Sequence, residues 1–166
     1  MHLQHKDAEL IAAVECGDEA AVSTLLAGGA DANTISGNGD RALMLAARDG
    51  YTGCINALTN GGAAVDQARQ DDGITALMLS AMLSQRGACR QLLELGADQT
   101  LKATDGGWAG MTAQELAQAQ GQVGTAALLV AWVGGTREVA ELDRVAAAAE
   151  AAAEVRDFTR VFRLSF

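Results

Sequence analysis

The chain repeats a short glycine–alanine motif at nearly constant spacing. It reads Gly-Ala-Asp at 29–31, Gly-Ala-Ala at 62–64 and Gly-Ala-Asp at 96–98, so successive copies begin 33 and 34 residues apart. A fixed period of that size is typical of a protein built from stacked repeats, in which each repeat contacts only its neighbours. The period therefore predicts a scaffold that holds another molecule, and not a buried active site.

Each unit contains a pair of predicted helices. Apolar residues recur at helical spacing, as in Leu43, Ala46 and Ala47, and a glycine or small polar residue follows each first helix. The first helices are predicted at 8–16, 41–49, 75–83 and 112–120, and the second helices at 19–27, 52–60, 86–95 and 123–133. We expect an N-terminal tail at 1–6 and four repeats at 7–36, 37–70, 71–104 and 105–133.

Three segments resemble the ankyrin repeat pattern G-x-T-P-L-H-x-A-A-x-x-G. They are GDRALMLAARDG at 39–50, GITALMLSAMLS at 73–84 and GMTAQELAQAQG at 110–121. The segments LLAGGADAN at 25–33 and LLELGADQT at 92–100 resemble the end of the same repeat. The resemblance implies an all-α ankyrin-repeat solenoid of about four helix-turn-helix repeats with short hairpin loops, covering roughly residues 7–133.

The chain departs from that pattern at the proline and histidine positions. The family proline is replaced by Ala42, Ala76 and Ala113, which costs little because proline there only pre-sets the first helical turn. The family histidine is replaced by Met44 and Met78, so the hydrogen bond that braces the hairpin loop is missing. We therefore expect looser hairpins and lower stability than in a consensus array.

The resemblance also implies a binding surface. Partners of the family usually lie against the concave face, which is formed by hairpin tips and the outward residues of each first helix. The matching positions in this chain are Asn38, Asp40, Arg48, Asp49, Asp71, Asp72, Ile74, Met82, Leu83, Leu95, Trp108, Ala109, Met111 and Ala119.

The second half of this strip is apolar. Ile74, Met82, Leu83, Trp108 and Met111 are expected to lack a neighbour to pack on, and exposed apolar side chains of this kind indicate a partner or a lid. A structural role is the alternative. Met82 and Leu83 would then turn inward, and Trp108 would fill the longer hairpin DGGWAG at 105–110.

The charge and motif content exclude several classes of function. The net charge of −9 argues against nucleic acid as a partner, because phosphate binding needs clustered cations, and favours a protein with a basic or apolar surface. Neither GNGD at 37–40 nor the pair Asp71–Asp72 forms a phosphate loop or a metal site, because the accompanying ligands are missing. We expect the adjacent carboxylates of Asp71 and Asp72 to be solvated on an exposed turn. We expect no cofactor, no metal and no enzymatic activity.

Cys16, Cys54 and Cys89 form no metal-binding or disulfide motif, so we expect all three to fill the core as small apolar residues. Free cysteines favour a reducing compartment, and we expect a cytoplasmic protein, with a nuclear or delivered effector left open. The hydroxyl of Ser80, at a packing position, is expected to bond back to a helix carbonyl.

A different composition begins after the repeats. Thr136 follows Gly134 and Gly135 as a predicted helix cap, and the glycine-free run 137–162 predicts one long helix within a C-terminal part at 136–166. The segment 155–166 is amphipathic and cationic, and its candidate contact residues are Phe158, Arg160, Phe162, Arg163 and Phe166.

Four roles remain open for this segment: docking on the acidic repeats, binding by another protein, a dimer contact or a membrane contact. The membrane contact is disfavoured because one short basic segment anchors weakly. For the chain as a whole the sequence predicts a non-catalytic protein–protein interaction module of the adaptor, inhibitor or effector kind. The alternatives are a switch whose tail covers the concave face, and an assembly protein that dimerises through its C-terminal helix.

Overall fold

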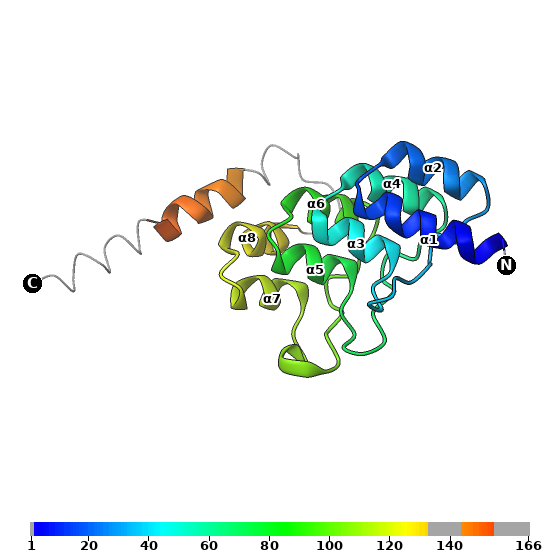
Figure 1. Cartoon of the computed structure of the whole chain (residues 1–166). Helices are drawn as coiled ribbons and strands as arrows, with labels where there is room; N and C mark the ends of the chain where they lie inside the picture. Colours follow the sequence, from blue (N-terminus) through cyan, green and yellow to red (C-terminus); the bar gives the residue numbers. More distant parts are fainter. Residues whose placement is uncertain (1, 133–143, 155–166) are drawn as a thin grey trace, which may run out of the picture.

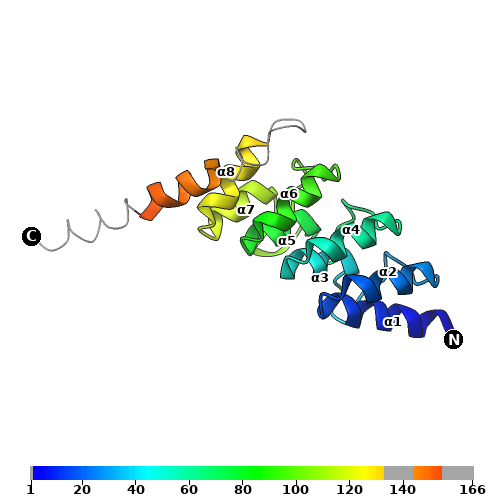
Figure 2. The same ribbon diagram turned by 90° about the horizontal axis from the view of Figure 1, so that it is seen from above.

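The computed structural model describes residues 2–132 and 144–154, and it folds the first of these parts into helix pairs (Figure 1). Seen from above, the first helices of the pairs form one row and the second helices form another (Figure 2). The first row, here called the inner row, contains α1 (His2–Glu15), α3 (Ala42–Asp49), α5 (Ala76–Met82) and α7 (Ala113–Ala119). The outer row contains α2 (Glu19–Ala27), α4 (Thr52–Asn60), α6 (Arg86–Glu94) and α8 (Val123–Ala131). The expected all-α solenoid is confirmed.

The helices end close to where the residue pattern predicts. The observed α2 and α4 coincide with the predicted ranges, while the later inner helices are one residue shorter at each end because the flanking residues are caps. Thr75 is such a cap, since its hydroxyl accepts a hydrogen bond from the Met78 N–H. The expected tail at 1–6 is wrong for residues 2–6, which begin α1. Within it, Lys6 Nζ donates to the Gly28 carbonyl at 2.6 Å.

Left-handed residues separate the inner helix from the outer helix in every pair. Gly17, Gly50 and Gly121 have φ values of 70°, 78° and 73°, which glycine adopts without steric cost. The third pair has Ser84 at this position, with φ 59°, and among the described residues it is the only non-glycine residue with positive φ. Its hydroxyl lies 3.3 Å from Thr125 Oγ1 of α8.

The free-energy cost of placing a non-glycine residue in this left-handed backbone conformation can be measured at Gly121. A Cβ added there would meet no heavy atom within 4 Å, so Gly121→Ala changes the backbone energy and little else. We expect a loss of about 1 kcal/mol in the free energy of unfolding, measured by chemical denaturation. Gly107→Ala is the control, because Gly107 also has open space but no positive φ, and its stability should not fall. Equal stabilities of the two variants would contradict this explanation.

The core lies between the two rows and runs the length of the stack. Inner helix α3 buries every residue from 42 to 47, because it has neighbours on both sides along the row and the outer row behind it. Alanines at these positions allow inner helices to approach closely, and larger side chains such as Ile55, Leu58 and Leu92 fill the space from the outer row. Met44 and Met78, at the family histidine positions, are each 1% exposed and belong to this core.

Side-chain oxygens in the first two connecting loops bond to the backbone of the next repeat. Asn33 Oδ1 accepts from the Ala64 N–H at 2.9 Å, and Asn33 Nδ2 donates to the Gly62 carbonyl at 3.2 Å. One period later, Asp66 Oδ1 accepts from the Asp98 N–H, also at 2.9 Å. Each bond satisfies a backbone group of the next pair and therefore fixes the spacing between repeats.

The helical segment 144–154 packs across the C-terminal end of the outer row. Ala146 is fully buried there, and Arg86 of α6 donates to Glu150 at 3.1 Å. Gly124 at the start of α8 lies against the Glu150 side chain, and a Cβ at Gly124 would overlap it. Figures 1 and 2 show the segment extending beyond α8, away from the rest of the stack. The remainder of the predicted helix 137–162 lies outside the described residues.

Candidate protein-binding surface

The inner row and the loops that lead into it form one continuous surface, here called the inner face. The loop between α2 and α3 is finger 2, that between α4 and α5 is finger 3, and that between α6 and α7 is finger 4. All three fingers extend to the same side of the stack, below the helices in Figure 1. Finger 4 contains the short 3-10 helix η1 (Gly106–Trp108), whose N-cap is Asp105.

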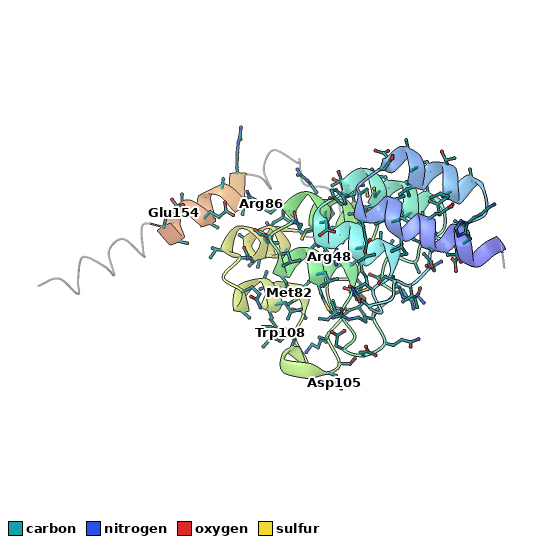
Figure 3. All side chains as sticks on the ribbon, viewed as in Figure 1. Arg48, Met82, Arg86, Asp105, Trp108 and Glu154 are labelled. Atoms are coloured by element: carbon teal, nitrogen blue, oxygen red, sulfur yellow. The ribbon has the colours of Figure 1, made fainter. Side chains whose placement is uncertain are left out.

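The last residues of successive inner helices line one edge of the inner face. Arg48 and Asp49 end α3, Met82 ends α5, and Leu83 follows it. Figure 3 labels Arg48 and Met82 along this edge, with Trp108 on the finger side. Leu83 is 49% exposed, which is unusual for a leucine that follows directly on a buried helix. Among the large apolar residues that the sequence places on the binding strip, it alone is exposed.

Arg48 and Asp49 bind each other. Arg48 Nε and Nη2 donate to the two carboxylate oxygens of Asp49 at 3.0 and 2.8 Å. The hydrogen bond to Asp49 raises the pKa of Arg48, and the nearby carboxylates of Asp40 and Glu15 raise it further. The Arg48 backbone carbonyl accepts from Gln85 Nε2 at 3.0 Å. The two charges are therefore largely matched within the surface, and a partner would meet a polar pair and not an isolated cation.

Fingers 2 and 3 are joined by a charged cluster centred on Arg69. Its guanidinium donates to Asp40 Oδ1 of finger 2 at 2.8 Å and to both carboxylate oxygens of Asp72 in its own finger. The Asp40 side chain is only 10% exposed. Hydrogen bonds from Arg69 lower the pKa of Asp72, so this carboxylate stays ionised to lower pH than usual. The cluster braces the hairpins, and it was not predicted from the sequence.

Two expectations for finger 3 are therefore wrong. Asp72 was expected as a solvated carboxylate beside Asp71, but Arg69 holds it; Asp71 alone is exposed. Ile74 was expected to be exposed on the binding strip, but it is 2% exposed and lies in the core. The reason is local: the backbone of Ile74 is held on both sides, its N–H by Asp72 Oδ1 and its carbonyl by the Arg69 N–H.

Finger 4 lies against finger 3, and its apolar residues are partly covered. The Asp72 carbonyl accepts from the Thr104 N–H at 2.7 Å. Trp108 and Met111 are half-buried and pack against the core, as Met82 does in α5. Trp108 therefore packs within the longer hairpin, and part of its side chain stays exposed; its contact with a partner remains a prediction.

The buried cysteines are core residues, as expected, but Cys16 is exposed, so the expectation is wrong there. Burial raises the pKa of the Cys89 thiol to about 12, and its sulfur lies 3.0 Å from Ser80 Oγ. The Ser80 hydroxyl donates to the Leu77 carbonyl at 2.9 Å, which confirms the predicted bond back to the helix. Among the described residues, no group of acidic, histidine and cysteine side chains is placed to hold a metal ion.

Thiol labelling of the native protein distinguishes the three cysteines. At about pH 8 a thiol with a pKa near 12 is almost wholly protonated, and burial also raises the pKa of Cys54. We expect one label per native molecule, at Cys16, and three labels in denaturant, both counted by mass spectrometry. Rapid native labelling at Cys89 would contradict the burial of this side chain.

Removing the Arg69 guanidinium should destabilise the fingers. Arg69→Ala leaves the Asp40 carboxylate nearly buried without this partner, and we expect a loss of about 1–3 kcal/mol in the free energy of unfolding. Arg48→Ala is the matched control. Its ion pair is more exposed, with 36% and 31% of the two side chains accessible, so its loss should stay below about 1 kcal/mol. Equal losses in chemical denaturation would show that Arg69 is not a brace.

Comparison with known proteins agrees with this architecture. The family model described as ankyrin repeats (3 copies) matches residues 10–103, which is more than half of the chain. The chain is also 34% identical over 96 residues to an ankyrin repeat-containing protein of Treponema pallidum (strain Nichols). That match covers 58% of this chain and 32% of the relative, so the chain spans about a third of the protein it resembles.

The chain belongs to the ankyrin repeat family. The matched residues extend from α1 into finger 4 and therefore include the edge that carries Arg48, Met82 and Leu83. Ankyrin repeats generally mediate protein–protein interaction, and the inner face offers the extended surface that such a role needs. In the described part of the chain, no helix has the length and apolar character required to cross a lipid bilayer.

Proposed function

We propose that this protein is a non-catalytic interaction module that binds a protein partner on its inner face, the concave face expected for the family. The exposed Leu83 carries the proposal. It follows the half-buried Met82 at the end of α5, and the polar pair formed by Arg48 and Asp49 ends the neighbouring α3, so one edge of the inner face carries both an apolar anchor and hydrogen-bonding groups. Protein interfaces commonly combine a buried apolar centre with a polar rim.

The partner's chemistry follows from the charges around this anchor. The chain has a net charge of −9, and exposed carboxylates occur on the fingers at Asp71 and Asp105. A partner with basic groups opposite the finger tips and an apolar patch opposite Leu83 and Trp108 would complement both features. Met111 contributes at the margin of this strip, whereas Ile74 is too deeply buried to contact a partner.

The rigidity of the surface favours a preformed binding site. Finger 2 is fixed to finger 3 through Arg69, and finger 3 is fixed to finger 4 through the Asp72 carbonyl. A partner would therefore not have to order the fingers, and less binding free energy would be lost on association. The buried, unpaired thiols of Cys54 and Cys89 favour a reducing compartment, and we propose that the protein acts in the cytoplasm.

The test is affinity purification with quantitative mass spectrometry, using Leu83→Asp against the unmodified chain. A charge placed in an apolar interface should reduce recovery of a specific partner at least about tenfold. Ser23→Asp is the matched control, because Ser23 is exposed on the outer helix α2, and it should recover the partner normally.

Two outcomes would contradict the proposal. Full recovery of the partner by Leu83→Asp would exclude this edge as the contact, and loss of the partner with Ser23→Asp alone would place the interface on the outer row. Thermal denaturation of both variants should show unchanged stability, since both positions are exposed.

A further inference from the structure

An apolar groove lies at the C-terminal end of the stack. Its walls are α7, α8 and the helical segment 144–154, and its volume is about 420 Å³. Val123, Val130 and Val145 line it together with alanines, and among the described residues Gln118 is the one polar residue of the lining. Val123 is 41% and Val130 57% exposed, and both belong to the most exposed large apolar residues of the described chain.

The groove occupies the place where a further helix pair would stack. In repeat proteins the last repeat normally carries a polar outer face, because nothing packs against it. Here that face is formed largely by valine and alanine, and an exposed apolar surface of this kind indicates a binding site. The inner face described above is a separate surface, and its proposed partner does not fill this groove.

We propose that the groove binds segment 155–166 of a second copy of this chain, and that two copies exchange these segments symmetrically. The three phenylalanines of the chain, Phe158, Phe162 and Phe166, all occur in this segment. Each would bury about 150–250 Å² of surface, so the two segments contribute about 900–1,500 Å² before the groove walls are counted. A stable dimer buries about 1,200–2,000 Å² in total, and the exchange therefore supplies enough area.

The electrostatics favour this occupant. The segment carries Arg156, Arg160 and Arg163 against one aspartate, whereas the whole chain has a net charge of −9. Two exposed glutamates lie on elements that form the groove, although neither is among its lining residues: Glu115 on α7, one turn before Gln118, and Glu154 at the end of the segment 144–154. Docking an apolar and basic segment here would bury phenylalanine among valines and bring the arginines close to carboxylates.

The direction of the helix favours exchange between two copies over docking within one. Nine residues separate Val145 from Glu154, so the segment 155–166 begins about 13 Å from the groove at Val145. The run 137–162 contains no glycine or proline at which a helix would readily reverse. Figures 1 and 2 show 144–154 leading away from α8 and from the rest of the stack.

Sedimentation velocity of the full chain over a range of concentrations tests the proposal. We expect a monomer–dimer equilibrium for the unmodified chain. Val130→Asp, in the groove, should raise the dissociation constant at least about tenfold. Ile35→Asp is the matched control, because Ile35 is 48% exposed at the opposite end of the stack, and it should dimerise normally.

A mixing experiment distinguishes exchange from other forms of dimerisation. The variant Phe158→Ser/Phe162→Ser keeps the groove but loses the apolar segment, and Val130→Asp keeps the segment but loses the groove. Each variant should be monomeric alone. An equimolar mixture should form heterodimers, because the intact segment of the Val130→Asp variant can bind the intact groove of the serine variant. Circular dichroism confirms that both variants fold, and the serine variant does not depend on the core because its changes lie outside the repeats.

Three results would overturn the proposal. They are a strictly monomeric unmodified chain at the highest concentration reached, dimers that persist in both variants, and a mixture that stays monomeric. Docking of the segment within its own chain would give the first result. Because Leu83→Asp leaves the groove intact, failure of the inner-face proposal would leave the dimer unchanged, so the two proposals fail independently.

Discussion

The structure depends on the burial of each helix pair against its neighbours. A single pair cannot cover its own apolar surface, and the clearest case is α3, in which every residue from 42 to 47 is buried. Three of these six residues are alanines, which let α3 and α5 approach closely enough to exclude water. The fingers and the edge at Leu83 keep their positions because this stacking fixes the inner row. The packing behind the inner face therefore determines where the side chains on that face lie.

Much of the fold could be predicted because its signals are local. Glycine positions and helical spacing located α2 and α4 to the residue, and Gly50 and Gly121 marked the turns between rows. The contacts between fingers could not be predicted in this way. Arg69 and Asp40 are 29 residues apart, and nothing in either local pattern shows that they meet. The loss of the family histidine suggested loose hairpins, yet Met44 fills the core and Arg69 supplies a brace elsewhere.

The candidate site was only partly predictable for the same reason. Leu83 could be identified because it stands at a surface position that repeats from unit to unit, and the fold exposes it. Ile74 also stands at such a position, but its exposure depends on how finger 3 bends, and Asp72 bends it inward through the Ile74 N–H. Repeat position thus predicts the row in which a residue lies, whereas hydrogen bonds in the loop decide which way it faces.

The two ends of the stack differ in the polarity of their surfaces. At the N-terminal end, Asp7, Thr34 and Ser36 share the surface with Ile11 and Ile35, so water can satisfy much of it. The surface at the C-terminal end is mostly apolar: it contains Val123, Val130 and Val145, and among the described lining residues only Gln118 is polar. The segment 144–154 covers the outer side of α8 but leaves the end face open. Stacking buries each pair only if another layer follows, and this last face is apolar at a place where the terminal repeat of a stack usually carries polar residues.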